Sequence, residues 1–415
     1  MSGYMDASIA IVSHTFAPDI NGQAVVLGRL FEGRSGVVRL SSDRLWRPAQ
    51  ADGCININVS PPWLIRKLRK AKLLETSIFR LYVSHRAKMI ASALRSHHCS
   101  CVIACTGGDL VDIPASIVAA ERTGVPCILH YFDDYRSQWK IPNPIWSSRW
   151  MERHGLAIEE EFVNRALGVV VPNELLYSEL TERVQLPLKI IRNPVGLMPY
   201  QSARNTSLPE KDGSSRSWRI SYTGSIYEAQ LDAVVNCARG IELLSQRGIA
   251  IQLHLYTSQS RESLQNQGVP ESVQIHPAVP LEEAVRVQCD SDFLLLPLAF
   301  RTRYPELIRT SAPGKMGEYL AAGRPILFHA PTDSFLVKFA SEQKCGLICD
   351  IPDKVQIASQ IERLVRDSQL RAMLSERARQ SSLLFSESVN REEYFKFIGE
   401  HTNRHFVTEQ RLRVA

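Results

Sequence analysis

Short apolar runs alternate with stretches of helical periodicity along this chain. In its first half, runs of four to six residues predict strands at Ser8–Ser13, Gly36–Ser41, Cys101–Cys105, Cys127–Tyr131 and Gly168–Val171. Helical patterns fall between them, at about residues 22–33, 76–97, 111–122 and 151–165. Strands that alternate with helices predict βαβ units and a parallel sheet.

The alternation restarts after a polar stretch, Gln201–Ser217, which has no periodicity and is predicted to be a loop or linker. Further strands are expected at Ile220–Thr223, Ile251–Tyr256, Val273–His276, Phe293–Pro297, Ile326–His329 and Gly346–Cys349. Helices fit near 228–246, 281–288, 314–322, 333–343 and 354–366, and residues 368–400 are expected to be helical throughout, without a strand.

Two similar α/β halves indicate two Rossmann-like domains that face each other across a cleft. The expected boundaries are residues 1–195 and 196–385, followed by a C-terminal helix, 386–415, that packs back toward the first domain. In open α/β sheets ligands bind at the carboxyl ends of the strands.

Composition places the chain among soluble globular proteins. Of its 415 residues 44% are hydrophobic and 22% charged, and no basic leader or membrane-length apolar run is present. Nine scattered cysteines favour reduced thiols and a cytoplasmic location. Cys99, Cys101 and Cys105 share one strand face by period two, which predicts packing rather than metal binding.

The net charge of +6 is unevenly distributed. Residues 63–98 contain nine Lys or Arg and one Glu, so this segment carries +8 and the rest of the chain −2. Leu64, Leu68 and Ala71 form an apolar stripe among the first of these cations. A basic helix of this kind can bind an anionic membrane surface or an acidic acceptor. Alternatively, it is an ordinary surface helix exposed to solvent. No aromatic residues interleave with the cations, which disfavours nucleic acid.

The segment from Thr310 to Pro325 carries the most informative chemistry. Pro313 and Gly314 predict a helix start, which places Lys315 in the first turn, where free amides and the helix dipole favour an anion. Glu318 follows one turn later on the same face. A cation beside an acceptor-only carboxylate suits a phosphorylated sugar, although an ordinary capped helix with solvated side chains fits the same residues.

Two glycines occupy equivalent places in the two halves. Gly22 falls between strand Ser8–Ser13 and the next helix, and Gly224-Ser225 follows strand Ile220–Thr223. A missing side chain at such a turn lets backbone amides approach a phosphate, although glycine also occurs there for steric reasons alone.

Together these motifs resemble the retaining GT-B glycosyltransferases, over essentially the whole chain. F-A-P-D-I-N-G-Q-A is similar to the first loop of the family, I-I-R-N-P-V-G to its interdomain segment and L-F-S-E-S-V to the motif before its last helix. S-Y-T-G-S-I-Y resembles the opening of its second domain. The most specific resemblance to the family lies in D-F-L-L-L-P-L together with residues 310–325. Within the family, these residues resemble a polysaccharide-assembly subset best.

The resemblance implies a nucleotide-diphosphate sugar donor and assigns residues to it. Lys315 would contact the donor phosphates and Glu318 the ribose, with Gly22 under the diphosphate. The remaining expected donor contacts are Gly224, Ser225, Arg309, Thr310 and Ser311. His130 or Asp133 would serve the sugar and acceptor side as catalytic residues. On local sequence alone, His130 could equally be packed, and Asp133 and Asp134 could cap the following turn.

Some positions depart from the family pattern. Thr310 stands where many members of the family have a glutamate that binds the donor sugar. Ser225 and Gln230 are neutral at the positions where members have a phosphate-binding Arg and Lys. Arg303, Arg309 or Lys315 could supply the missing charge. Asp290-Ser291-Asp292 matches a metal-binding D-x-D, but it directly precedes a buried strand, so neither a metal nor another cofactor is expected.

The sequence therefore predicts a metal-independent transferase that moves a sugar to a hydroxyl of a glycan or lipid-linked acceptor, with retention, in cell-surface polysaccharide or glycoconjugate synthesis. Residues 63–98 would contact the inner face of the membrane peripherally. The alternatives are a UDP-sugar epimerase of the same architecture and a catalytically silent GT-B scaffold.

Overall fold

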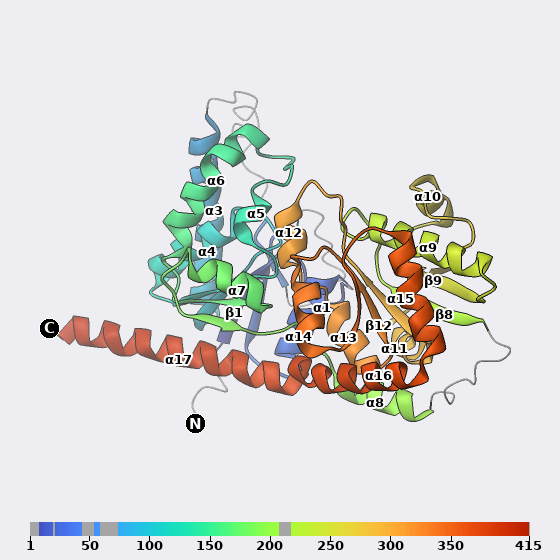
Figure 1. The fold of residues 1–415 in the computed structure, drawn as a ribbon. Coiled ribbons are helices and arrows are strands. Elements are labelled where there is room, and N and C mark those ends of the chain that lie inside the picture. The colour runs from blue at the N-terminus through green and yellow to red at the C-terminus, as the bar shows by residue number, and fades with distance from the viewer. Residues whose placement is uncertain (1–7, 20, 44–53, 59–73, 207–216, 415) are drawn as a thin grey trace. The chain divides into compact units, whose positions relative to one another are not determined.

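The computed structural model describes residues 8–19, 21–43, 54–58, 74–206 and 217–414 (Figure 1). The chain divides into two compact units. The first contains Met1–Arg192 and Ser388–Ala415, and the second contains Asn193–Glu387. Each unit has its own parallel sheet and its own core, as expected for an α/β protein of this length.

The first unit contains a seven-stranded parallel sheet in the order β3-β2-β1-β4-β5-β6-β7. Its strands are β1 (Ser8–Ser13), β2 (Val37–Ser41), β3 (Cys54–Asn56), β4 (Cys99–Cys105), β5 (Cys127–His130), β6 (Gly168–Val171) and β7 (Leu188–Ile190). The strand order reverses between β1 and β4, and such a reversal opens a ligand-binding crevice at the carboxyl ends of the two strands.

Helices cover both faces of this sheet. They are α1 (Gly22–Phe31), α3 (Glu75–Ser96), α4 (Asp112–Thr123), α5 (Tyr135–Gln138), α6 (Ser148–Val163), α7 (Glu174–Thr181) and α17 (Glu387–Val414). Apolar side chains of α3, α4, α6 and α7 fill the core on one face. On the other face α1 packs together with Tyr394, Phe397 and Ile398 of α17, so the end of the chain completes the core of the first unit.

The second unit contains a six-stranded parallel sheet in the order β10-β9-β8-β11-β12-β13, with its reversal between β8 and β11. The strands are β8 (Trp218–Thr223), β9 (Ile251–Thr257), β10 (Gln274–Pro277), β11 (Phe293–Pro297), β12 (Ile326–His329) and β13 (Gly346–Cys349). The buried run Phe293–Pro297 is apolar throughout because a central parallel strand is covered on both faces.

Nine helices of the described chain surround this second sheet: α8 (Leu197–Thr206), α9 (Leu231–Gln246), α10 (Arg261–Asn266), α11 (Leu281–Asp290), α12 (Pro305–Thr310), α13 (Lys315–Ala322), α14 (Phe335–Gln343), α15 (Lys354–Arg366) and α16 (Ser368–Ser382). Helices α9 and α15 pack on one face with Ile220, Leu253 and Leu295. Helix α13 contacts β11, and α11 contacts β8, α8 and α13.

Three expectations about local structure were wrong. Residues 201–206 of the predicted linker belong to helix α8, and residues 207–216 lie outside the described part. Residues 368–400 are interrupted by a short 3₁₀ turn, Leu383–Phe385, after which Ser386 forms a β-bridge with Val195. Cys99 does not share the face of Cys101 and Cys105, because a register shift in the pairing of β1 with β4 turns it into the opposite core.

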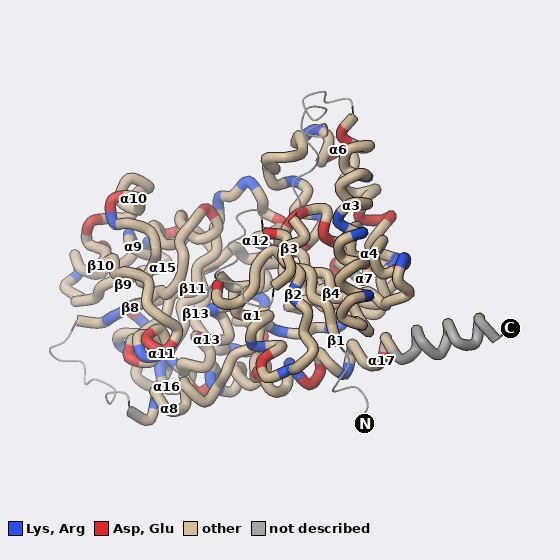
Figure 2. Tube along the Cα trace, turned by 180° about the vertical axis from the view of Figure 1, so that it is seen from behind, with Lys and Arg blue, Asp and Glu red and all other residues tan. Residues whose placement is uncertain are grey.

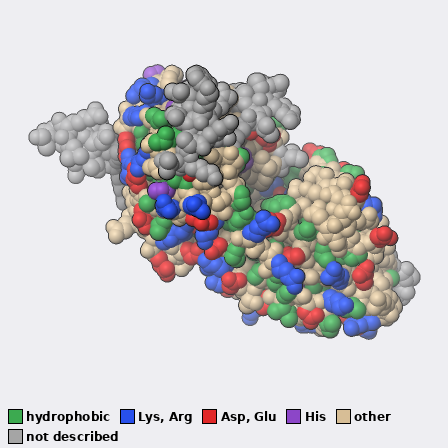
Figure 3. Space-filling model, turned by 90° about the horizontal axis from the view of Figure 1, so that it is seen from above, with side chains coloured by type: hydrophobic (Ala, Val, Ile, Leu, Met, Phe, Trp, Pro, Cys, Tyr) green, Lys and Arg blue, Asp and Glu red, His purple; other side chains and the backbone are tan. Residues whose placement is uncertain are grey.

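Charge is more evenly distributed over the described residues than the count for 63–98 suggests. Basic and acidic positions are interspersed over the elements of both units (Figure 2), and the face seen in Figure 3 mixes basic, acidic and apolar side chains. The apolar stripe Leu64, Leu68 and Ala71 lies outside the described residues. None of the helices in the described part combines the length and hydropathy that a bilayer crossing requires.

Candidate functional site

In the second unit, the predicted donor residues gather at the carboxyl edge of the sheet, where its strand order reverses. Gly224 directly follows β8, and α13 begins at Lys315, beyond the long loop that leaves β11. The first turn of α13 therefore lies at the same edge as the glycine turn, with amides that have no partner inside the helix.

Gly224 and Lys315 are neighbours across this edge. A Cβ added to Gly224 would lie 3.5 Å from Cε of Lys315 and 3.2 Å from the hydroxyl oxygen of Tyr222. The φ of Gly224 is 143°, which residues with a side chain rarely adopt, so the backbone conformation favours glycine, and the Tyr222 hydroxyl leaves little space for a Cβ. The Tyr222 hydroxyl donates to the carbonyl of Ser225 at 2.8 Å and fixes the turn.

Lys315 and Glu318 form an ion pair on one face of α13. Nζ of Lys315 donates to Oε2 of Glu318 at 3.1 Å. The Lys315 side chain is 33% exposed and that of Glu318 only 4% exposed. The carboxylate is thus held in place, and the ammonium group is accessible to an anion at a helix start.

The segment before α13 gives its residues different environments. Thr310 is buried, and its hydroxyl donates to the carbonyl of Glu306 at 3.1 Å within α12. Arg309 lies in the last turn of that helix, and Ser311 is its half-buried cap residue. The side-chain amide of Asn193 donates to the Ala312 carbonyl at 2.8 Å, so the predicted interdomain segment also holds the loop before α13.

Ser225 and Gln230 precede α9 and carry no charge. Ser225 is exposed, and the Gln230 side chain accepts a hydrogen bond from the Tyr227 amide at 3.4 Å, just before α9. The nearby Arg303 is exposed, and its backbone amide donates to the Glu228 carboxylate at 3.1 Å. Lys315 is therefore the cation for which the structure shows direct proximity to the glycine turn.

In the first unit, Gly22 begins α1 at the carboxyl edge of the sheet. The side chain of Asn21 caps this helix by accepting from the Ala24 amide at 3.0 Å. A Cβ added to Gly22 would meet no atom of the described residues within 4 Å, so packing against them does not require glycine there. Gln23 donates to the Ser13 hydroxyl at 2.9 Å and to the Thr106 carbonyl at 3.1 Å, which ties α1 to the ends of β1 and β4.

His130 lies at the end of β5 but inside the core. Its exposed fraction is 2%, its Nδ1 is 3.0 Å from the Tyr394 hydroxyl of α17, and its ring stacks on Phe132. Burial lowers its pKa to about 3, so the ring is neutral over the physiological range. These contacts give His130 a packing role that joins β5 to α17.

Asp133, three residues further on, is in a different situation. The Thr106 hydroxyl accepts from the amides of Phe132 and Asp133 and donates to the Asp133 carbonyl at 3.0 Å. Within the described residues no hydrogen bond or ion pair engages its carboxylate, and burial, with a contribution from Asp134, raises its pKa to about 6.

Asp134 is the capping residue of this pair. It accepts from the amide and the hydroxyl of Ser137 at the start of α5, and it is paired with Arg183 at 2.7 Å. The two adjacent carboxylates therefore differ in role. Asp134 is structural, whereas Asp133 is available to accept a hydrogen bond from a ligand.

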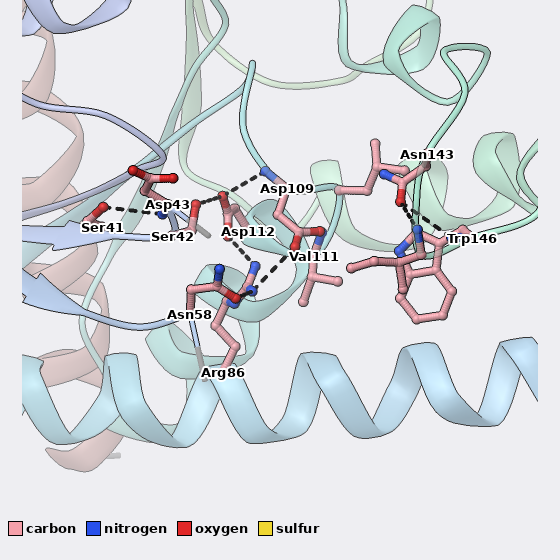
Figure 4. A network of polar contacts seen from close by, with 12 residues as sticks. Ser41, Ser42, Asp43, Asn58, Arg86, Asp109, Val111, Asp112, Asn143 and Trp146 are labelled. Atoms are coloured by element: carbon pink, nitrogen blue, oxygen red, sulfur yellow. Dashed lines mark hydrogen bonds and ion pairs between the residues drawn. The ribbon is translucent and has the colours of Figure 1, made fainter. Parts of the chain in front are cut away.

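A buried ionic network, which sequence reasoning missed, organises the same edge of the first unit (Figure 4). Arg86 of α3 is paired with Asp112 at 2.6 Å and Asp109 at 3.4 Å, and its other contact is the Asn58 side chain at 3.3 Å. Asp112 also accepts from the Ser42 hydroxyl at 2.6 Å. The loops after β2, β3 and β4 are thus fixed together, and Arg86 is not a surface cation of the basic segment.

The D-x-D motif lies at the opposite edge of the second sheet. Asp292 precedes β11 and accepts from the amide of Arg219 near the start of β8, at 2.8 Å. Ser291 is buried, and its hydroxyl is hydrogen-bonded to the Ser221 hydroxyl at 2.6 Å. Within the described residues no group of three or more His, Cys, Asp and Glu could hold a metal ion.

The order 3-2-1-4-5-6 of the second sheet and the reversal of the first are the signature of Rossmann-like domains. Sucrose-phosphate synthase from Thermosynechococcus elongatus superposes with a TM-score of 0.70 at 13% identity, over 95% of this chain and 98% of that one. The chain has the GT-B fold.

Other structures with this GT-B fold are also similar. A glycosyltransferase from Rickettsia africae has a TM-score of 0.66 at 12% identity, covering 96% of this chain and 99% of its own. HepE from Anabaena, solved with UDP and glucose, has a TM-score of 0.62 at 13% identity, covering 95% and 99%. No protein-family model matches the sequence, and no curated protein matches it significantly.

Proposed function

We propose that this protein is a glycosyltransferase that moves a sugar from a nucleoside diphosphate donor to a hydroxyl acceptor, with retention of configuration. The observation that carries the proposal is the cluster of Gly224, Lys315 and Glu318 at the switch point of the second sheet. HepE, which has the same fold, was solved with UDP and glucose.

The chemistry follows from the charges at this edge. As the glycosidic bond breaks, negative charge accumulates on the leaving diphosphate. The Lys315 ammonium, the first amides of α13 and the glycine turn would stabilise that charge. Glu318, an acceptor held in place by Lys315, would receive the ribose hydroxyls. The chain's own cation and amides supply this stabilisation, so the proposal includes no metal.

On the acceptor side we assign the contact with sugar hydroxyls to Asp133 rather than His130. Within the described residues the Asp133 carboxylate has no hydrogen-bond or ion-pair partner, and its pKa is raised. His130, in contrast, is buried, with its ring stacked on Phe132 and its Nδ1 beside the Tyr394 hydroxyl. Retention by attack from the leaving-group face needs no side-chain nucleophile. The proposed acceptor is a glycan or lipid-linked hydroxyl in polysaccharide or glycoconjugate synthesis.

A donor screen tests the proposal. UDP-, GDP-, ADP- and dTDP-sugars are incubated with candidate acceptors, and release of the nucleotide is measured for the wild type and for Lys315→Ala. We expect one donor class to be used, and Lys315→Ala to lower kcat/KM by about two orders of magnitude through loss of a charge-stabilising group. Unchanged release in Lys315→Ala would remove this residue from the mechanism.

The same screen separates the alternatives. Conversion of a UDP-sugar alone, without transfer, would indicate an epimerase, and no nucleotide binding by calorimetry would indicate a silent scaffold. Peripheral membrane contact through residues 63–98 remains a prediction, now without Arg86, which is buried in the first unit. Liposome sedimentation that is independent of anionic lipid and salt would exclude it.

A further inference from the structure

A buried amide connects two parts of the proposed donor site. Gln288 of α11 has no exposed surface. Its Nε2 donates to the Thr223 hydroxyl at 2.8 Å and to Oε2 of Glu318 at 3.4 Å, and its Oε1 accepts from the Tyr200 hydroxyl at 3.0 Å. Gln288 therefore links the last residue of β8, just before Gly224, with the carboxylate on α13.

The charges around Gln288 determine how its amide is oriented. If the amide were reversed, its carbonyl oxygen would face the Glu318 carboxylate, which only accepts hydrogen bonds. In the observed orientation the two hydrogens of Nε2 are directed to two acceptors, and the carbonyl receives the hydroxyl of Tyr200. Every polar atom of the buried amide is satisfied, which is the condition for keeping it in a core.

We infer that Gln288 is a positioning residue that holds Glu318 in the orientation that receives the ribose hydroxyls of the donor. The inference rests on the proposed function. Gln288 is itself fully buried, so it acts through Glu318 and does not contact the nucleotide. Lys315 holds the same oxygen from the exposed side and Gln288 from the buried side, so the carboxylate is fixed between them.

The ribose hydroxyls provide a specific test. Binding of UDP and of 2′,3′-dideoxy-UDP is measured by titration calorimetry with the wild type and with Gln288→Leu, which has a similar size and no hydrogen-bonding groups. We expect the wild type to bind UDP roughly tenfold more tightly than the dideoxy nucleotide, as for one or two hydrogen bonds to a charged group. In Gln288→Leu this ratio should fall to near one.

A second ligand pair shows whether the effect is specific. The ratio of UDP to UMP affinity reports on the diphosphate contact of Lys315, and it should be unchanged in Gln288→Leu. Gln288→Glu is expected to weaken UDP binding at least as much, because it places a second carboxylate against Glu318. An unchanged ribose preference in Gln288→Leu would overturn the inference.

Ser291→Ala is the matched control for damage to α11. Ser291 follows this helix, and its hydroxyl donates to the Val287 carbonyl and accepts from the Ser221 hydroxyl, each at 2.6 Å. Its loss removes buried hydrogen bonds without touching Glu318, so it should lower stability and leave the ribose preference intact. If a loss of ribose preference also appeared in Ser291→Ala, the effect would be structural and the inference would fail.

Failure of the proposed function gives a different result. If the wild type binds neither UDP nor GDP, ADP or dTDP, there is no donor site and both proposals fall. If the wild type selects another base, the same comparison is made with the dideoxy form of that nucleotide. If the wild type binds and discriminates as expected while Gln288→Leu does the same, only the role of Gln288 is wrong.

Discussion

Gly224 combines a backbone conformation that residues with a side chain rarely adopt with a position beside Lys315, the proposed phosphate ligand. Gly224→Ala would add a Cβ at a φ of 143° and within 3.5 Å of Lys315 Cε. We expect a loss of about 1–3 kcal/mol in the free energy of unfolding, the usual cost of such a conformation. We also expect roughly tenfold weaker UDP binding, because the Tyr222 hydroxyl, 3.2 Å from the added Cβ, must shift and loosen the turn that it holds beside Lys315. Thermal unfolding and titration calorimetry measure the two effects.

Gly268→Ala separates the two effects. Gly268 belongs to the same unit and has a φ of 92°, but a Cβ there would meet no atom within 4 Å. This control should lose stability and keep UDP affinity. Equal losses of UDP affinity in the two variants would show that crowding of the Tyr222 hydroxyl at Gly224 has no effect on binding.

Asp133 should make the protein less stable as the pH rises. Its pKa is raised from 3.8 to about 6 in the folded state by burial, so folding favours the protonated form. The stability contribution of this protonation is complete below pH 3.8 and is lost as the pH rises through about 6. Asp133→Asn removes the penalty, so at pH 7.5 it should increase stability by up to about 3 kcal/mol, and by little at pH 4.

Denaturant unfolding at the two pH values measures this difference. Asp134→Asn provides the opposite control, because it loses the Arg183 pair and part of the α5 cap and should be destabilised at pH 7.5. If Asp133 contacts the acceptor, Asp133→Asn should also lose most of its transfer activity although it is more stable. A variant that is both less stable and fully active would contradict the assignment.

At the scale of elements, buried apolar strands and long periodic helices could be predicted, whereas short elements without an apolar run or a period could not. Strands Ser8–Ser13 and Gly168–Val171 and helix Lys354–Arg366 have the predicted bounds. Strand Cys54–Asn56 and helices Tyr135–Gln138 and Pro305–Thr310 are too short to show a period. Cys99 was placed on the wrong face because a bulge adds a residue to one strand only, which a period-two pattern cannot reveal.

Helix α3 offers a matched pair of arginines for testing the buried network. Arg86→Leu leaves Asp112 buried with its charge uncompensated, and we expect a loss of about 3–5 kcal/mol in the free energy of unfolding. Arg80, six residues earlier, pairs with Glu161 on the surface, with side-chain exposures of 51% and 36%. Arg80→Leu should cost no more than about 1 kcal/mol.

Denaturant unfolding of both variants, followed by circular dichroism, measures the difference. The double variant Arg86→Met/Asp112→Asn removes the arginine together with its nearer carboxylate. It should recover part of the stability lost in Arg86→Leu, because the Asp112 charge is no longer buried without its partner and only Asp109 keeps that penalty. If Arg86→Leu were no less stable than Arg80→Leu, the network in Figure 4 would contribute nothing to folding.

At the scale of the whole molecule, contacts between distant residues decide what a sequence can reveal. Lys315 and Glu318 were found because they lie one turn apart on a helix with readable ends. Gln288 was not found, because its partners Tyr200, Thr223 and Glu318 are 88, 65 and 30 positions away. The sequence could not decide between a catalytic and a packing role for His130. The decisive contact is the hydrogen bond between its Nδ1 and the hydroxyl of Tyr394, which lies 264 positions later in the chain.

The division of the chain into two units predicts which part of the molecule the donor stabilises. Tyr394 of α17 belongs to the first unit, and Tyr394→Phe removes its hydrogen bond to His130, at an expected cost of about 1 kcal/mol. In scanning calorimetry, the transition that moves to a lower temperature in this variant is therefore the unfolding of the first unit. All of the predicted donor residues except Gly22 lie in the second unit, Lys315 and Glu318 among them, so UDP should raise the other transition.

At a UDP concentration 100 times the dissociation constant, the added stability should be about 2.7 kcal/mol, because the ligand binds only the folded unit. Lys315→Ala should reduce this shift, and Tyr394→Phe should leave it unchanged. A UDP-dependent rise confined to the transition that Tyr394→Phe lowers would place nucleotide binding on the first unit. Gly22, at the start of α1, would then be the residue to test, because its exposed turn has room for a phosphate.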